Sequence, residues 1–249
     1  MPTERNTHPA RAAAVAALLA AAVAVAPRAA AWDVAADASR EDFEAFHRHF
    51  ATSVYAYPRH SATPLGLIGF DVWAEAAADQ DFADEPFFDG AIDGDLTGDL
   101  LVVGRVGARK GLPAGIDVGL SYAEVLEGDL ELVTAELGWA IVDGGLISPT
   151  LGLRLTGTQT IGSGAYELDQ YGAELLLSKG FAILTPYVGG GVVYSEGTLQ
   201  RDLGGTFETD DTRFVAYAGL TLNLLVPKIT VELERGETIT GAVRVAIGF

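Results

Sequence analysis

The last ten residues, Thr240 to Phe249, read Thr-Gly-Ala-Val-Arg-Val-Ala-Ile-Gly-Phe. Large apolar residues alternate in this stretch with small or charged ones, Val243, Val245, Ile247 and Phe249 against Ala242, Arg244, Ala246 and Gly248. A period of two residues is typical of a β-strand with one apolar face and one polar or small face. Both a soluble sandwich and a barrel can use such a strand, so the rest of the chain has to decide between them.

Composition favours one exported or membrane domain over a nucleic-acid-binding or disulfide-linked one. The 249 residues are 49% hydrophobic, include 30 glycines and contain no cysteine, which excludes disulfides and thiolate metal sites. The formal net charge is −18, and no local basic patch is visible. A chain this acidic repels nucleic acid and anionic lipid surfaces, so neither is expected as a partner.

Residues 1–31 have the pattern of a secretory signal peptide. Arg5 and Arg11 form a positive segment, an apolar run covers 12–26, and small residues at 29–31 precede Trp32. No later stretch reaches 18 consecutive apolar residues, the length that a transmembrane helix needs. We therefore expect export without a helical membrane span.

Strand-like segments account for most of the chain after residue 64. We expect ten of them, at about 65–77, 98–110, 115–125, 130–142, 147–158, 166–179, 183–195, 210–225, 228–236 and 239–249. The second, fourth, sixth and eighth connections are short, whereas 78–97, 159–165 and 196–209 are long. This parity predicts an all-β, antiparallel, up-and-down barrel with both barrel termini on the side of the tight turns.

The two faces of the expected strands differ sharply in charge. One face carries large apolar residues, such as Val106, Leu120, Leu137, Leu155, Leu175, Phe214 and Leu233. The other collects nearly all strand charges, namely Asp71, Glu75, Arg105, Arg109, Asp117, Glu136, Arg154, Glu174, Arg213, Glu232, Glu234 and Arg244. A lysine or arginine facing acyl chains costs about 2–4 kcal/mol, so the charged face must point into the lumen of a transmembrane barrel.

Particular motifs carry a resemblance to a known group. The C-terminal Phe249 on an alternating strand resembles the last strand of bacterial outer-membrane β-barrels, which implies an insertion signal read by the barrel insertion machinery. The run Lys-Gly-Leu-Pro-Ala-Gly-Ile-Asp-Val-Gly at 110–119 and the run Thr-Pro-Tyr-Val-Gly at 185–189 resemble an uncharacterised family of proteobacterial outer-membrane β-barrel proteins. The resemblance covers roughly residues 40–249 and implies outer-membrane lipid and lipopolysaccharide as surroundings.

One amphipathic helix is expected before the barrel, from Ser39 to about Tyr57. Ser39 can cap it, and Phe43, Phe46 and Phe50 fall on one face. We favour packing at the periplasmic end of the barrel, and the alternative is a plug in the lumen. The expected organisation is thus a signal peptide at 1–31, a periplasmic N-terminal segment with the helix at 32–63, and the barrel at 64–249.

Candidate chemistry is sparse. No histidine lies on an expected strand or surface loop, and His47 and His49 point apart on the helix, so neither a catalytic centre nor a metal site is expected. The loop 78–97 is rich in aspartate and suits weak divalent cation binding, although a plain solvated loop explains it equally simply. No cofactor motif is present.

The sequence thus predicts a non-enzymatic outer-membrane barrel of structural or surface-interaction type. Its lumen charges form either a paired structural network or the lining of a narrow passage, which leaves a small low-conductance pore as the alternative. A membrane-embedded hydrolase is the least favoured class, because it would rest on acidic pairs such as Glu232 and Glu234 without a strand histidine.

Overall fold

The computed structural model describes residues 32–94, 96, 100–145, 147–162, 164–202, 204–224 and 227–248. The signal peptide predicted for 1–31 and the insertion signal predicted at Phe249 lie outside the described residues, so both stay predictions. Among the described residues, no helix has both the length and the apolar character needed to cross a membrane.

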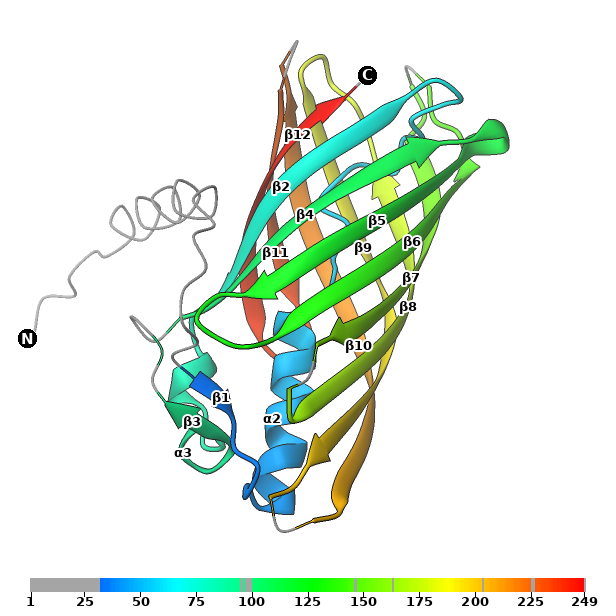
Figure 1. Ribbon diagram of the computed structural model, residues 1–249. Helices are drawn as coiled ribbons and strands as arrows, with labels where there is room; N and C mark the ends of the chain where they lie inside the picture. The colour runs from blue at the N-terminus through cyan, green and yellow to red at the C-terminus, as the bar shows by residue number, and fades with distance from the viewer. Residues whose placement is uncertain are drawn as a thin grey trace, which may run out of the picture.

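Ten antiparallel strands close into a barrel in the order β10-β11-β12-β2-β4-β5-β6-β7-β8-β9 (Figure 1). Their bounds are β2 Phe70–Asp79, β4 Leu101–Gly111, β5 Ile116–Val125, β6 Glu131–Val142, β7 Thr150–Ile161, β8 Tyr166–Ser178, β9 Leu184–Gln200, β10 Thr206–Asn223, β11 Lys228–Arg235 and β12 Ile239–Gly248. The predicted fold class and all ten strands are confirmed. The last strand pairs with the first, Arg244 lying opposite Glu75, so the alternating C-terminal stretch closes the wall.

The outer wall of the barrel is apolar. Phe214 is 83% exposed, Leu233 67% and Leu120 64%. Every barrel strand carries at least one exposed large apolar side chain on its outer face. Exposing apolar surface to water costs about 25 cal/mol of free energy per Å². A continuous apolar outer surface on a closed barrel fits an acyl-chain environment.

The two ends of the barrel differ in their connections. At the turn end, where Phe70 begins β2 and Gly248 ends β12, short turns join the strands, including one with a 3₁₀ turn at Pro113–Gly115. At the loop end, the chain between β2 and β4 forms the 3₁₀ turn η1, Phe82–Asp84, the helix α3, Phe88–Ala91, and the strand β3, Ile92–Gly94. β3 pairs with β1, Trp32–Val34.

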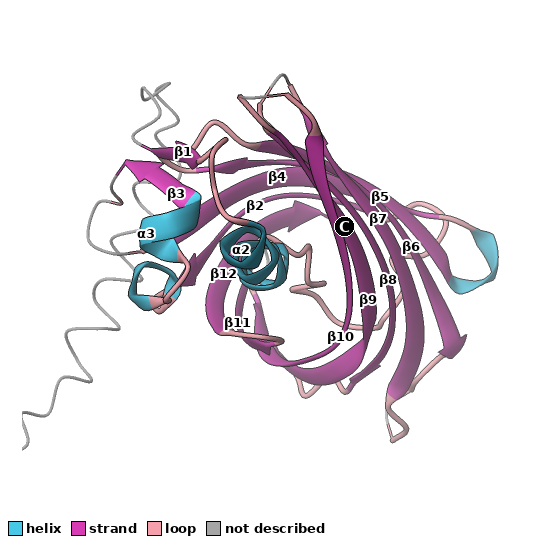
Figure 2. Ribbon diagram, turned by 90° about the horizontal axis from the view of Figure 1, so that it is seen from below, coloured by secondary structure: helices cyan, strands magenta, loops and turns pink. Residues whose placement is uncertain are grey.

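The N-terminal helix α2, Arg40–Ser53, lies inside the ring of strands (Figure 2). As predicted, Ser39 caps it, and its hydroxyl accepts a hydrogen bond from the Asp42 backbone amide. The prediction that the helix packs at the periplasmic end, where the barrel begins and ends, is wrong. The helix α2 lies at the loop end, where His49 forms a hydrogen bond with Asp79, the last residue of β2. The C-terminal half of α2 is almost wholly buried, and its polar side chains His47, His49 and Thr52 find hydrogen-bond partners on the barrel strands.

A single apolar core joins this helix to the loop-end segments. Phe46 and Phe50 of α2 stack at 5.0 Å and contact Phe82 of η1 and Tyr166 of β8. Trp32 of β1 packs edge-on against Phe50. The loop 78–97 is therefore not a plain solvated loop, since its phenylalanines help to build this cluster, which we call the cap core.

Candidate functional site in the barrel lumen

The chain between α2 and β2 passes along the lumen from the loop end to the turn end. Strand side chains hold its backbone at successive levels: Arg105 donates to the Val54 carbonyl at 2.8 Å and Arg244 to the Pro58 carbonyl at 3.0 Å. Nearer the turn end, the Leu65 amide donates to Asp117 at 3.1 Å. An extended chain advances about 3.3 Å per residue, so these residues suffice to thread the barrel. The lumen is thus occupied from one end to the other.

Two glycines in the wall make room for this filling. A Cβ at Gly172 would collide with the Tyr55 hydroxyl, and a Cβ at Gly197 would collide with the His47 ring. Glycine allows such close approach because it has no side chain. Wall and plug are therefore matched in shape.

Arg59 is the centre of the main ionic cluster, and sequence analysis did not select it. Its guanidinium donates two hydrogen bonds to Glu234, from Nε at 2.7 Å and from Nη2 at 3.0 Å, and a third to Glu75 from Nη1 at 2.5 Å. Arg105 also donates to Glu75, at 3.2 Å. A bidentate, fully buried pair of this kind fixes the plug to the wall.

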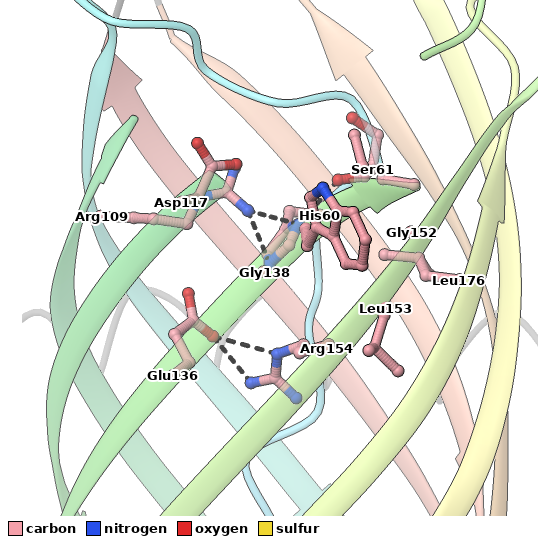
Figure 3. A pocket seen from close by; sticks show the side chains of 13 residues that line it. His60, Ser61, Arg109, Asp117, Glu136, Gly138, Gly152, Leu153, Arg154 and Leu176 are labelled. Atoms are coloured by element: carbon pink, nitrogen blue, oxygen red, sulfur yellow. Dashed lines mark hydrogen bonds and ion pairs between the residues drawn. The ribbon is translucent and has the colours of Figure 1, made fainter. Parts of the chain in front are cut away.

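Arg154 forms a second cluster on the neighbouring part of the wall (Figure 3). It donates to Glu136 through Nε at 3.1 Å and Nη2 at 2.8 Å, and to Glu174 through Nη1 at 3.0 Å. Register explains the proximity, because Arg154 lies directly opposite Glu174 on β8. The small cavity drawn in Figure 3 is about 20 Å³, which leaves room for little more than one water molecule.

The turn end carries a looser arrangement. Asp71 accepts from Lys228 at 2.8 Å and from Arg109 at 3.5 Å, and Arg109 also contacts the His60 ring. A cavity of about 290 Å³ lies beside these groups.

The loop end brings a helical histidine to a strand serine. His47 Nε2 lies 3.0 Å from Ser195 Oγ, and its Nδ1 lies 2.7 Å from the Tyr166 hydroxyl. Burial, then Arg213, lowers the pKa of His47 to about 4. Histidine and serine at this distance are the parts of a nucleophilic pair, but both side chains are 0% exposed, so a substrate has no access to Ser195. The contact ties α2 to β9.

All twelve predicted lumen charges are on the inner side of the wall. Glu136 is half-buried and the other eleven are buried, namely Asp71, Glu75, Arg105, Arg109, Asp117, Arg154, Glu174, Arg213, Glu232, Glu234 and Arg244. The structure divides them between sites rather than joining them in one network. Arg213 serves the helix, donating to the Arg48 carbonyl and Thr52, and Glu232 accepts from Tyr187.

The described acidic side chains of the loop 78–97 do not gather into a metal site. Asp79 is used by His49, Ser53 and Thr238, all within hydrogen-bond distance. Within the described residues, no group of three or more potential ligands could hold a metal ion. Asp95 and Asp99 lie outside those residues.

Comparison with known proteins finds no match in sequence and distant matches among solved structures. No family model matches the chain, and no curated protein matches it in sequence. Membership of the uncharacterised proteobacterial family therefore stays a prediction.

Solved structures that align with the chain include three bacterial proteins. Ail, the attachment invasion locus protein of Yersinia pestis, is 11% identical over 73% of this chain and 97% of its own, with a TM-score of 0.31. Neisserial surface protein A is 10% identical over 72% and 95%, also with a TM-score of 0.31. The outer-membrane protein Omp33 of Acinetobacter baumannii is 6% identical over 74% and 100%, with a TM-score of 0.34. Function must be argued from this chain itself.

Proposed function

We propose that this protein is a bacterial outer-membrane β-barrel whose lumen is closed by its own N-terminal region and which acts as a structural or surface-interaction protein rather than a pore. One observation carries the proposal: α2 and the threaded segment after it occupy the lumen from the loop end to the turn end, with Arg59 clamped between Glu75 and Glu234. A plug held by buried bidentate ion pairs blocks solute passage.

The proposed location rests on the apolar outer wall and on the parity of the connections. Bacterial outer-membrane barrels place short turns in the periplasm and longer connections outside. In that orientation the cap core, and with it Trp32, faces the cell exterior, and the barrel termini face the periplasm. Export by the signal at 1–31, insertion through Phe249 and contact with lipopolysaccharide complete the proposal.

The location is tested by cell fractionation and by gel migration. Recovery in the outer-membrane fraction and faster migration of the unheated sample are expected, since a closed barrel satisfies all its backbone hydrogen bonds and resists detergent. A soluble periplasmic monomer would contradict the proposal. Deleting Phe249 is expected to impair assembly in cells more than refolding in detergent, and equal effects would leave Phe249 without a signalling role.

Planar-bilayer recording tests the closed lumen. The full barrel should give no steady single-channel current. A variant lacking residues 32–63, which removes both α2 and the threaded segment with Arg59, should conduct, provided that its unheated sample still migrates as a folded barrel. A steady current from the unaltered protein would overturn the closed lumen and favour the small pore.

A further inference from the structure

The cavity at the turn end combines a cationic lining with hydroxyl groups in a protein that is otherwise strongly acidic. Its volume is about 290 Å³, several times what one water molecule needs. Four cationic side chains line it, Arg59, Arg109, Lys228 and Arg244, against a single carboxylate, Asp71. The whole chain has a net charge of −18, so this local excess of positive charge runs against the composition.

The ion pairs around the cavity leave positive charge without an equal partner. Lys228 and Arg109 share Asp71, at 2.8 and 3.5 Å. Arg244 makes a long contact of 3.7 Å with Glu75, a carboxylate that already accepts from Arg59 and Arg105. Arg59 is matched by Glu234, so the excess positive charge is that of Arg109, Lys228 and Arg244. One carboxylate serving two or three cations cannot neutralise them, and an anion entering the cavity would be attracted.

Arg244 also supplies an unused donor. Its guanidinium lies over the Trp73 ring at 3.8 Å, which fixes the plane of the group, while Nη1 donates to the Pro58 carbonyl. Its Nη2 has no hydrogen-bond partner among the described residues, and Arg244 is only 3% exposed, so bulk water does not supply one. A buried donor left unpaired costs about 1–3 kcal/mol, more when it is charged, and a bound oxyanion would recover that cost.

Hydroxyl and amide groups complete the lining. Thr221 and Thr230 line the cavity and share one hydrogen bond of 2.9 Å, so their hydroxyls retain capacity for a further partner. Asn223 and Thr185 line the same cavity. Guanidinium, ammonium and hydroxyl donors around a cavity of this volume are the set that binds phosphate, sulfate or carboxylate groups.

We propose that the turn-end cavity is a binding site for an oxyanion group, a phosphate, sulfate or carboxylate carried by a small molecule or by a lipid headgroup. Lys228 and Arg244 hold the negative charge, and the Thr221 and Thr230 hydroxyls orient its oxygens. The site goes beyond the closed lumen proposed above and shares part of its lining, including Arg59, with the threaded segment. Anion binding and conductance are separate measurements, so either proposal can fail while the other stands.

Two variants on one strand test the site in the full-length barrel. Inorganic phosphate and sulfate are titrated calorimetrically into protein held in a non-ionic detergent. Lys228→Met removes the cation at the cavity and should weaken phosphate binding at least tenfold, whereas Lys228→Arg should restore most of it. Arg235→Met, at the exposed opposite end of β11, removes the same charge away from the cavity and should leave binding unchanged. Trp73 provides a second readout, because a ligand on Arg244 should change its fluorescence, and Trp73→Phe should abolish that change.

A parallel titration in bicelles containing phosphatidylglycerol distinguishes the two sources of the oxyanion. Saturable binding of free phosphate identifies a soluble ligand, and a Lys228-dependent response to bicelles alone identifies a lipid headgroup. Absence of saturable binding in both titrations would overturn the proposal, as would equal weakening by Lys228→Met and Arg235→Met. Each protein is first checked for its folded, heat-modifiable form, so that loss of binding is not loss of the barrel.

Discussion

The lumen is filled with rings at the loop end and with charges at the turn end. The cap core places Phe43, Phe46, Phe50 and Phe82 at 0% exposure. At the turn end, Arg109, Lys228 and Asp71 border a cavity of about 290 Å³. Apolar packing gains from every contact and tolerates no void, whereas charges need hydration or partners. The same barrel therefore holds its plug tightly at one end and leaves an aqueous space at the other.

The strongest test of this difference is the removal of one ring from the cap core. Phe50→Ala should lower the free energy of unfolding by about 3–5 kcal/mol, because Phe50 is 0% exposed and its loss leaves a cavity between α2 and the wall. Denaturant unfolding of the barrel refolded in vesicles measures it. Phe181→Ala, at the turn end and 59% exposed, is the matched control and should cost far less. Equal losses would mean that the cap core has no special part in stability.

A somewhat smaller loss is expected from breaking the Arg154 cluster, which lies between the two ends. Arg154→Met leaves Glu136 and Glu174 without their cation, and removing one partner of a buried pair costs about 3–5 kcal/mol. We expect about 3 kcal/mol, near the lower limit, because the Glu136 side chain is 10% exposed and can be hydrated at its exposed edge. The unfolding midpoint measures the loss, and Arg154→Met/Glu174→Leu should recover part of it. A loss below about 1 kcal/mol would show that water screens this cluster as it does exposed pairs.

The barrel wall follows from the sequence, because each strand alternates and the cost of a charge in lipid forbids the opposite assignment. The predicted ends of β5, β6 and β11 agree with the structure to within one residue. Placement of α2 does not follow. An amphipathic pattern indicates that one face of the helix is buried, but it does not indicate which end of the barrel that face packs against.

Arg59 escaped prediction for a related reason. It lies between Pro58 and Pro64, where no period of two or 3.6 residues marks an inward face. Its partners Glu75 and Glu234 are 16 and 175 residues away, so only the closed barrel brings the three together. One signal was available: Tyr55, Tyr57 and Arg59 alternate after the helix, and such large side chains suit a buried extended segment.

Acid should weaken the loop end in a way that reports on His47. Its pKa is about 4 when folded, against about 6.5 for a histidine in water, so the folded protein keeps this ring neutral above pH 4. The unfolded chain takes up a proton as the pH falls through 6.5 and the folded chain does not, so the stability contribution is full above pH 6.5 and is lost towards pH 4. The loss is roughly 2–3 kcal/mol. His47→Gln should flatten the pH dependence of unfolding over that window, and parallel curves would place the titration elsewhere.

The smallest effect on stability is expected at the turn end, from Lys228→Met. The Lys228 side chain is 31% exposed and borders the cavity, so its pair with Asp71 is screened by water although its length is 2.8 Å. Pairs in such surroundings contribute about 0–1 kcal/mol, and salt reduces that further. We therefore expect the unfolding midpoints of the parent and the variant to differ slightly at low ionic strength and to converge as sodium chloride is raised, measured by denaturant unfolding. A loss of about 3 kcal/mol that persists in salt would show that Asp71 is as dry as Glu174. The two ends of the lumen would then be held by the same kind of buried contact, and the aqueous character assigned to the turn end would be wrong.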